Sequence, residues 1–439
     1  MSSQDEKLAR DLDNVFAQVS VADPPAQERP ESVARRRSRR GPMPSSTATL
    51  SLVRIDGVLR WTYRRPARRV GRRRAARAGT GPIGGKVIRS FDFREIPPNE
   101  IVKKIDELDT KLTPHRGLRQ WIRGQLGPVA GPVKAKRILL FIHGTFSKSE
   151  MFFTELTATP EGRAFLDLAG KKYGAILGFD HATLSVGPIL NAMDLEESLG
   201  GTTAPIDVVC HSRGGLVAAW WLRIGKRKVD KVVFVASPLE GTSLASPPRL
   251  KATLDRLANI ADAIEKTVSV GAAFSPPAAP LLGVASGLMQ VLGGALSIGA
   301  RTPLVDAGVA VVAGLAGQSA VGNNPELLRL HRGQWLSSPR CFAVKSDFEP
   351  GDPNASWWMF WKSWKNPALK AADILADPVF SGPNDLVVDA GSMTRLLSAE
   401  LPTDDVCDFE TNNLVHHCNY FAQKKTVEFL QKVLEIPQT

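Results

Sequence analysis

The sequence predicts an α/β protein, built on a doubly wound, mostly parallel sheet with a helical cap insertion and a disordered basic N-terminal leader. Three observations lead to this fold class. Short apolar runs alternate with helical patterns from about residue 137 onward, one run leads into a sharp turn with a serine at its apex, and nearly all the net charge lies near the N-terminus. Strands that alternate with helices form parallel sheets, and such sheets bind ligands at the carboxyl ends of their strands.

Continuous apolar runs mark the predicted strands, as is typical of strands buried on both faces of a parallel sheet. The first run ends in His143-Gly144, and the third leads into the serine turn. Both turns are therefore expected at the same edge of the sheet. The predicted strands are 137–142, 173–179, 206–209, 231–236, 341–344 and a last one at 406–409, with helices that include 214–228 and 421–434.

The serine turn reads Cys210-His211-Ser212-Arg213-Gly214-Gly215. A strand that turns sharply into a helix needs small residues two before and two after the serine, and Cys210 and Gly214 occupy these positions. Cys210 departs from the G-x-S-x-G pattern, and a serine before a helix can also be an ordinary N-cap. In the sharp turn, however, the hydroxyl is raised above the sheet beside the backbone N–H groups of the helix N-terminus. A nucleophile and half of an oxyanion hole are the functional interpretation.

The length of 439 residues fits one large α/β domain with appendages. Four scattered cysteines without a C-x-x-C pair indicate neither a disulfide framework nor a metal site, so a reducing compartment is expected. The first residues are polar and include Asp5, Glu6, Asp11 and Asp13, which argues against a secretory or transit signal. We expect a cytoplasmic protein that can associate with a membrane surface.

The net charge of +12 belongs to one segment. Residues 31–80 contain fifteen arginines against Glu31 and Asp56, so the rest of the chain is nearly neutral. The arginines form two blocks, 35–40 and 64–77, separated by an alternating stretch that could make a short hairpin around Asp56-Gly57. We expect residues 35–77 either to contact an anionic membrane or another polyanion, or to be a solvated disordered segment. No specific nucleic-acid motif accompanies them.

From about Arg137 to the C-terminus the chain resembles the α/β-hydrolase superfamily, in particular its serine hydrolases of the lipase and esterase type. The serine turn carries this resemblance together with the strand that ends in His143-Gly144. In this family a backbone N–H just after that glycine joins the N–H that follows the nucleophile. The resemblance therefore implies oxyanion-hole donors at Thr145 or Phe146 and at Arg213.

The same resemblance implies that an acid and then a histidine follow Ser212 in the chain. Asp385 is the expected acid, because Ser381-Gly382-Pro383-Asn384-Asp385 is a turn that runs into an apolar stretch. Asp404, Asp405 and Asp408 are its rivals, although they lie on or beside the last predicted strand.

Only two histidines lie after Asp385, namely His416 and His417. The spacing His417-x-x-Tyr420-Phe421 before the final helix resembles the histidine loop of the family and favours His417 as the base. His416 is the alternative, because adjacent side chains cannot both face Ser212. His211 is expected to pack beneath the serine turn, and His181 to be structural.

These residues predict a serine hydrolase that cleaves carboxylic esters of apolar or lipid-like substrates through an acyl-enzyme. Such chemistry requires neither a cofactor nor a metal. An acyltransferase that uses the same Ser-His-Asp triad is the first alternative, since water exclusion depends on the geometry of the cap. A non-catalytic scaffold on a hydrolase fold, tethered to a membrane or polyanion, is the second.

We expect four parts: a leader at 1–80, an extension at 81–136 that packs on the core, the hydrolase domain at 137–439, and within it a cap insertion at about 243–338. Residues 271–300 lack charge altogether. They are either buried cap helices or, with 305–315, a membrane hairpin. The tryptophan-rich stretch 357–365 is either an interfacial helix or the core face of a helix beside the site.

Overall fold

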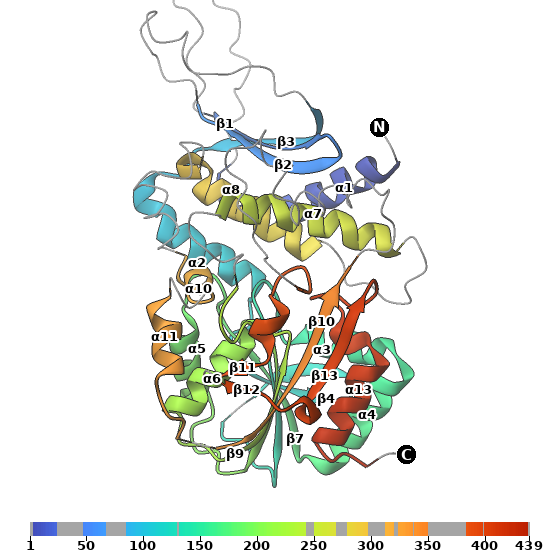
Figure 1. Cartoon of the computed structure of the whole chain (residues 1–439). Coiled ribbons are helices and arrows are strands. Elements are labelled where there is room, and N and C mark those ends of the chain that lie inside the picture. Colours follow the sequence, from blue (N-terminus) through green and yellow to red (C-terminus); the bar gives the residue numbers. More distant parts are fainter. Residues whose placement is uncertain are drawn as a thin grey trace, which may run out of the picture.

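The computed structural model describes residues 3–23, 47–66, 85–129, 131–242, 250–268, 279–296, 312–319, 324–336, 338–349, 383–397 and 399–437. Two layers make up this part of the chain. A large sheet with helices on both faces lies below a smaller layer of helices and a three-stranded sheet (Figure 1).

The large sheet has eight strands, of which six are parallel, and this confirms the doubly wound α/β fold. Across the sheet the strands are β13 (Val406–Asn412), β10 (Arg340–Phe348), β9 (Val229–Val235), β8 (Ile206–His211), β6 (Ile138–Ile142), β7 (Ala175–Asp180), β4 (Gly117–Ile122) and β5 (Gln125–Pro128). The chain passes from β6 to β7 on one side and then to β8 on the other. The carboxyl ends of β6 and β8 therefore flank the switch point, where ligands bind in such sheets.

Successive side chains of each strand pack against opposite layers of helices. Leu140 of β6 faces the core shared with α5 (Pro188–Ser198) and α6 (Gly214–Ile224). Its neighbour Leu139 faces the core shared with three helices on the other side. Those helices are α3 (Glu150–Ala158), α4 (Pro160–Lys172) and α13 (Lys424–Val433). This burial on both faces explains why the strands are continuous apolar runs in the sequence.

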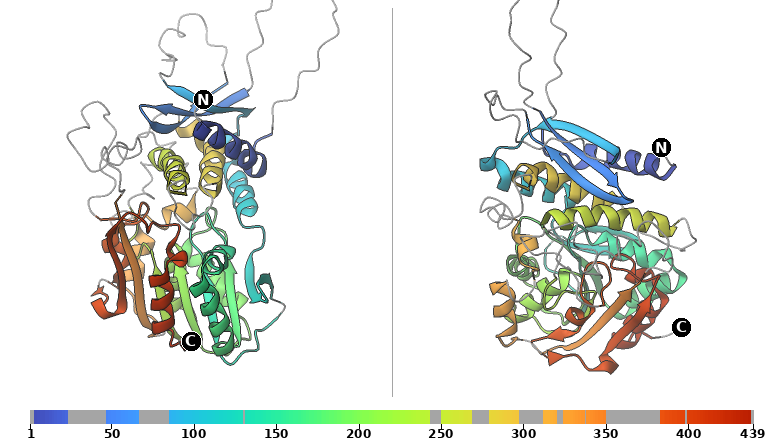
Figure 2. Two further views of the ribbon diagram at one scale, coloured as in Figure 1. Left: turned by 90° about the vertical axis from the view of Figure 1, so that its right-hand side faces the viewer. Right: turned by 45° about the horizontal axis from the view of Figure 1, so that its top comes forward.

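The upper layer, which we call the cap, is assembled from distant parts of the chain. Its elements are α1 (Ser3–Val19), β1 (Thr47–Ile55), β2 (Val58–Arg64), β3 (Lys86–Arg94), α2 (Ile101–Leu112), α7 (Leu250–Val268) and α8 (Ala279–Leu296). They share one apolar core, to which Leu12, Trp61, Leu108, Leu254 and Leu288 all contribute. Figure 2 shows the cap helices lying between the three-stranded sheet and the large sheet.

The cap corrects the expectation that residues 1–80 form a disordered leader. Residues 3–19 are a helix, and 47–64 are the hairpin expected around Asp56-Gly57, with Ile55 opposite Val58. Both segments bury apolar side chains against α7 and α8, some two hundred residues away in sequence. The many arginines of residues 31–80 suggested disorder, and the residues that bury these two segments lie far away in the chain.

The expected extension at 81–136 is divided between the two layers. Strand β3 pairs with β1 and so belongs to the cap, whereas β4 pairs antiparallel with β7 and extends the large sheet. The large sheet therefore begins before residue 137, at β4. Alternating and amphipathic patterns alone do not reveal which sheet a strand joins.

Within the described residues, no helix combines the length and the apolar character needed to cross a bilayer. Helix α8 covers much of the charge-free stretch and is buried in the cap against α1 and α7, in line with the buried cap helices expected as one alternative. Residues 35–40 and 67–77 of the arginine blocks, and the tryptophan-rich stretch 357–365, lie outside the described residues.

Candidate active site

Ser212 lies at the apex of the turn between β8 and α6, with a φ of +53°. A left-handed conformation costs a residue other than glycine about 1–3 kcal/mol, so the surrounding structure must enforce it. The Ser212 N–H donates to the carbonyl of Val235 in β9 at 2.9 Å. Gly214 permits the close crossing, because a Cβ there would lie 2.2 Å from the carbonyl oxygen of Ile142. Cys210, at the other small-residue position, is fully buried in the strand.

His417 lies between Ser212 and Asp385. Its Nε2 is 2.9 Å from the Ser212 Oγ, and its Nδ1 is 2.8 Å from the Asp385 Oδ2. With Nδ1 protonated and donating to the carboxylate, Nε2 is free to accept the serine proton. The structure thus brings together the three residues that the sequence singled out.

The loop that carries Asp385 fixes this carboxylate. The backbone N–H groups of Val387 and Val388 donate to its Oδ1 at 3.1 and 2.9 Å. Tyr420 donates its hydroxyl to Oδ2 at 3.1 Å, and the His417 N–H donates to the Asp385 carbonyl at 3.0 Å. Acid and base are therefore joined through both backbone and side chains.

The other two histidines near the triad have different surroundings. His211 is buried beneath the turn, as expected, and its Nε2 is 2.9 Å from the His417 carbonyl oxygen. His416, the alternative base, accepts the Cys418 N–H at its Nδ1 and packs edge-on against Phe348. Burial lowers the pKa of His416 to about 4. His417 and not His416 therefore contacts Ser212.

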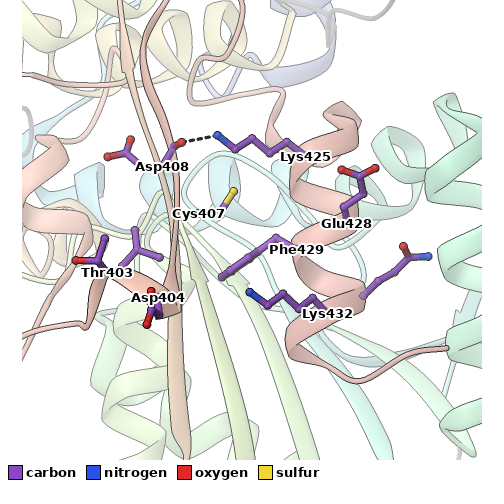
Figure 3. A pocket seen from close by; sticks show the side chains of 10 residues that line it. Thr403, Asp404, Cys407, Asp408, Lys425, Glu428, Phe429 and Lys432 are labelled. Carbon is purple, nitrogen blue, oxygen red and sulfur yellow. Dashed lines mark hydrogen bonds between the residues drawn. The ribbon is translucent and has the colours of Figure 1, made fainter. Parts of the chain in front are cut away.

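The rival carboxylates lie elsewhere. Asp404 and Asp408 line a cavity of about 830 Å³ between β13 and α13, at the outer edge of the large sheet (Figure 3). Asp405 forms an ion pair with Arg340 at 2.8 Å. No triad residue lines this cavity.

The turn after β6 lies against Ser212. A Cβ on Gly144 would be 2.5 Å from the Ser212 Cβ, so only glycine allows this approach. Of the two expected donors that follow, Phe146 already donates its N–H to the Thr183 Oγ1 at 3.4 Å. Of the two expected oxyanion donors on this side, Thr145 is therefore the one whose N–H is not directed at Thr183, and the Arg213 N–H lies at the start of α6.

His143 supports this turn from behind. It accepts the His181 N–H at Nε2, 3.1 Å away, so its proton resides on Nδ1, which is 2.8 Å from the Gly144 carbonyl oxygen. His181 stacks on the His143 ring with 4.1 Å between centroids, which agrees with its expected structural part. Burial lowers the pKa of both imidazoles and keeps them neutral.

The side chain of Arg213 has contacts that the sequence did not suggest. Its guanidinium is fully buried and donates to the Val186 and Gly314 carbonyls and to the Asn191 Oδ1. Burial lowers its pKa to about 10. Arg213 thereby connects the serine turn to α10 (Ala313–Ala316), a short helix of the insertion.

The triad is covered in this structure. Ser212 and His417 are only 4% and 7% exposed. Ile260 and Leu281 of the cap pack with Phe348 and Leu386 in a small apolar cluster that also touches Cys418, next to His417. The described part of the chain contains no group of three or more histidine, cysteine or carboxylate side chains arranged to hold a metal.

Two buried side chains that support the loops around Ser212 carry little or no signal in the sequence. Asp109 of α2 is fully buried and accepts the N–H groups of residues 183–185, the loop that holds Phe146. In the sequence, the one sign of this part is that Asp109 follows Leu108 directly on the apolar face of a helix. Gln318, which accepts a hydrogen bond from Thr145, has no sequence signal at all.

The chain is similar to one protein family and to several solved structures. The model of a family described as "Domain of unknown function (DUF7379)" matches residues 113–435. A search of curated proteins returned no match. Similar solved structures include the mature lipase BlEst2 of Bacillus licheniformis (16% identity, covering 70% of this chain and 96% of that chain, TM-score 0.32) and lipase 1 from Pelosinus fermentans (12%, 70% and 100%, TM-score 0.39). Carboxylesterase CesB of Bacillus subtilis is another (13%, 77% and 97%, TM-score 0.30). Likeness at this level says nothing about the substrate.

Proposed function

We propose that this chain, which belongs to the DUF7379 family of domains of unknown function, is a serine hydrolase that cleaves carboxylic esters. The observation that carries the proposal is the unbroken chain of contacts from Asp385 through His417 to Ser212, at 2.8 and 2.9 Å. An ordinary N-cap serine has no reason to contact an imidazole that a buried carboxylate orients.

In the proposed reaction, the Ser212 Oγ attacks the ester carbonyl carbon while the His417 Nε2 takes the hydroxyl proton. The negative charge moves to the carbonyl oxygen, where the N–H groups of Thr145 and Arg213 stabilise it. Collapse of this intermediate breaks the bond to the leaving alcohol, which receives the proton from His417. Water then repeats both steps on the acyl-enzyme, releasing the acid and restoring Ser212.

The surroundings of the triad support an apolar substrate. Ser212 is almost fully covered, and the cap contributes the aliphatic Ile260 and Leu281 to the apolar cluster that touches Cys418, next to His417. Burying an apolar chain beside them contributes about 25 cal/mol per Å², which favours longer acyl chains over acetate. We therefore expect apolar or lipid-like esters as the substrate class.

A fluorophosphonate probe tests the proposal, because it reacts with a serine only where an activated hydroxyl faces an oxyanion hole. The wild-type chain should be labelled and Ser212→Ala should not. Ser198→Ala, on the exposed side of α5, is the matched control and should be labelled like the wild type.

A folded wild-type chain that resists the probe would refute the enzyme and favour a non-catalytic scaffold. For the labelled enzyme, the turnover of esters of increasing acyl length should rise with chain length. A preference for acetyl esters would contradict the proposed substrate class.

A further inference from the structure

Thr145 is attached to the insertion through its side chain. Its Oγ1 donates to the Gln318 Oε1 at 3.0 Å, and Gln318 is only 5% exposed. Gln318 follows α10, so this hydrogen bond joins residues that are 173 positions apart in the chain.

Gln318 is itself held at several atoms. Its Nε2 donates to the Gly314 carbonyl at 3.0 Å, and its own carbonyl accepts the Thr242 N–H at 2.8 Å. The Gly314 carbonyl also accepts the Arg213 Nε–H at 3.3 Å. One carbonyl of α10 therefore connects to both sides of the proposed oxyanion hole, to Thr145 through Gln318 and to Arg213 directly.

Helix α10 has little freedom to shift. A Cβ on Gly314 would lie 1.9 Å from the Thr183 carbonyl oxygen, and the Gly314 N–H donates to the Leu184 carbonyl at 2.9 Å. The loop that contains these two residues is fixed in turn by the buried carboxylate of Asp109. Gln318 thus extends from a rigid support.

The peptide that precedes Thr145 is fixed from the opposite direction. The Gly144 carbonyl lies 2.8 Å from the His143 Nδ1 and accepts the Ser147 hydroxyl at 3.2 Å. Because C=O and N–H point in opposite directions across a trans peptide, these contacts turn the Thr145 N–H away from His143. The hydrogen bond from the Thr145 hydroxyl to Gln318 holds the Thr145 end of the same peptide in position, so the peptide that carries this N–H is anchored at both ends.

We infer that Gln318 is a positioning residue that holds the Thr145 N–H as an oxyanion donor and makes the oxyanion hole depend on the insertion. This inference rests on the proposed function. Oxyanion donors act through preorganisation, and losing one outright slows catalysis about 10²- to 10³-fold. Releasing the Thr145 side chain from Gln318 while keeping the Thr145 N–H should slow catalysis less, by roughly tenfold.

The test is a double-mutant cycle on Thr145→Val and Gln318→Leu, which remove the hydrogen bond from either end. For each protein, the second-order rate of fluorophosphonate labelling and the kcat and KM for a short ester are measured. We expect each single variant to lose rate in labelling and in kcat with KM nearly unchanged. The double variant should be no slower than the slower single variant, because both remove one interaction.

Two further variants separate positioning from general loosening. Asn324→Ala removes the N-cap of α11 (Pro325–His331) and its hydrogen bonds to the carbonyls of Gly317 and Ser319, so it loosens the same segment without touching Thr145. It should label at nearly the wild-type rate. Thr145→Ser keeps the hydroxyl and should recover most of the rate that Thr145→Val loses. Thermal melting verifies that each variant is folded.

Labelling of Gln318→Leu at the wild-type rate would overturn the inference. The inference would also be overturned if the rate losses of Thr145→Val and Gln318→Leu multiplied in the double variant. It would likewise be overturned if Asn324→Ala slowed labelling as much as Gln318→Leu does. If the wild type itself is not labelled, the proposed function fails, and the inference fails with it.

Discussion

At the scale of single residues, hydrogen-bond geometry distinguishes neighbouring side chains between which the sequence left an alternative open. His416 and His417 are neighbours, yet His417 alone contacts both Ser212 and Asp385. Asp385 is surrounded by donors, including the Tyr420 hydroxyl and two backbone N–H groups. These donors hold its carboxyl group in place beside the His417 Nδ1.

Asp385→Asn should nearly abolish the reaction while leaving the fold intact. An amide keeps the shape and one acceptor oxygen, but its NH₂ group cannot accept the proton from the His417 Nδ1, so the imidazole is held in the wrong tautomer. We expect fluorophosphonate labelling to slow about 10³- to 10⁴-fold. Asp408→Asn, in a rival acid on β13, is the control that should label normally. Comparable loss in both variants would contradict the assignment of Asp385.

At the scale of elements, helix α7 completes the edge of the small sheet. Strand β2 is an edge strand, and its outward backbone groups need partners. Asn259 of α7 accepts the Leu59 N–H at 2.9 Å and donates to the Leu59 carbonyl at 2.8 Å, while Asp255 accepts the Trp61 N–H at 2.7 Å. Arg54 of β1 adds ion pairs to Asp5 of α1 and Asp262 of α7. The insertion and the N-terminal segment are thus parts of one unit.

Asn259→Ala should destabilise the cap. It leaves the N–H and the carbonyl of Leu59 buried without these partners, and each unsatisfied group costs about 1–3 kcal/mol. Urea unfolding should show a lower midpoint than the wild type, by an amount that corresponds to at least about 1 kcal/mol. Lys7→Ala, at an exposed position of α1 in the same cap, should change the midpoint little. Equal midpoints for Asn259→Ala and wild type would show that α7 does not anchor the sheet edge.

At the scale of the whole molecule, buried ionisable groups set the pH range of stability. Burial lowers the pKa of His143, His181, His211 and His416 below the ordinary value near 6.5. Below that pH the unfolded chain binds protons that the native imidazoles do not, so stability falls as the pH drops. Burial raises the pKa of Glu155 to about 8, so the opposite holds for it: stability is lost as the pH rises from about 4.3 to 8.

The melting temperature should therefore peak at about pH 7, where the slopes from the four histidines and from Glu155 cancel, with a steep acid side and a shallow alkaline side. Each histidine contributes up to about 1.4 kcal/mol per pH unit below its unfolded pKa, so four of them outweigh one carboxyl there. Glu155→Gln should flatten the decline on the alkaline side up to about pH 8 and steepen the acid side, because the opposing contribution of this carboxyl begins at about pH 4.3. A melting temperature that stays constant from pH 7 to pH 5 would contradict the contribution of the histidines.

Much of the large sheet was predictable because its signals are local. Ile138–Ile142 and Ile206–His211 are continuous apolar runs, and Gly144 and Gly214 are needed where backbones approach within van der Waals distance of Ser212 and β6. The cap was not predictable in this way. Residues 3–23 and 47–66 are buried by residues between 250 and 296, and no sequence pattern within either segment indicates which part of the chain it packs against.

The sequence by itself predicted the sheet, the serine turn and the candidate residues Ser212 and Asp385, because strand periodicity and sharp turns impose local constraints on residue type. Only the tertiary structure showed that His417 and not His416 contacts Ser212, and that the Phe146 N–H already has a partner in Thr183. It also revealed the hydrogen bond between Thr145 and Gln318 and the packing of residues 3–23 and 47–66 in the cap. Each of these depends on contacts between residues far apart in the chain, which chain folding sets and local sequence does not encode.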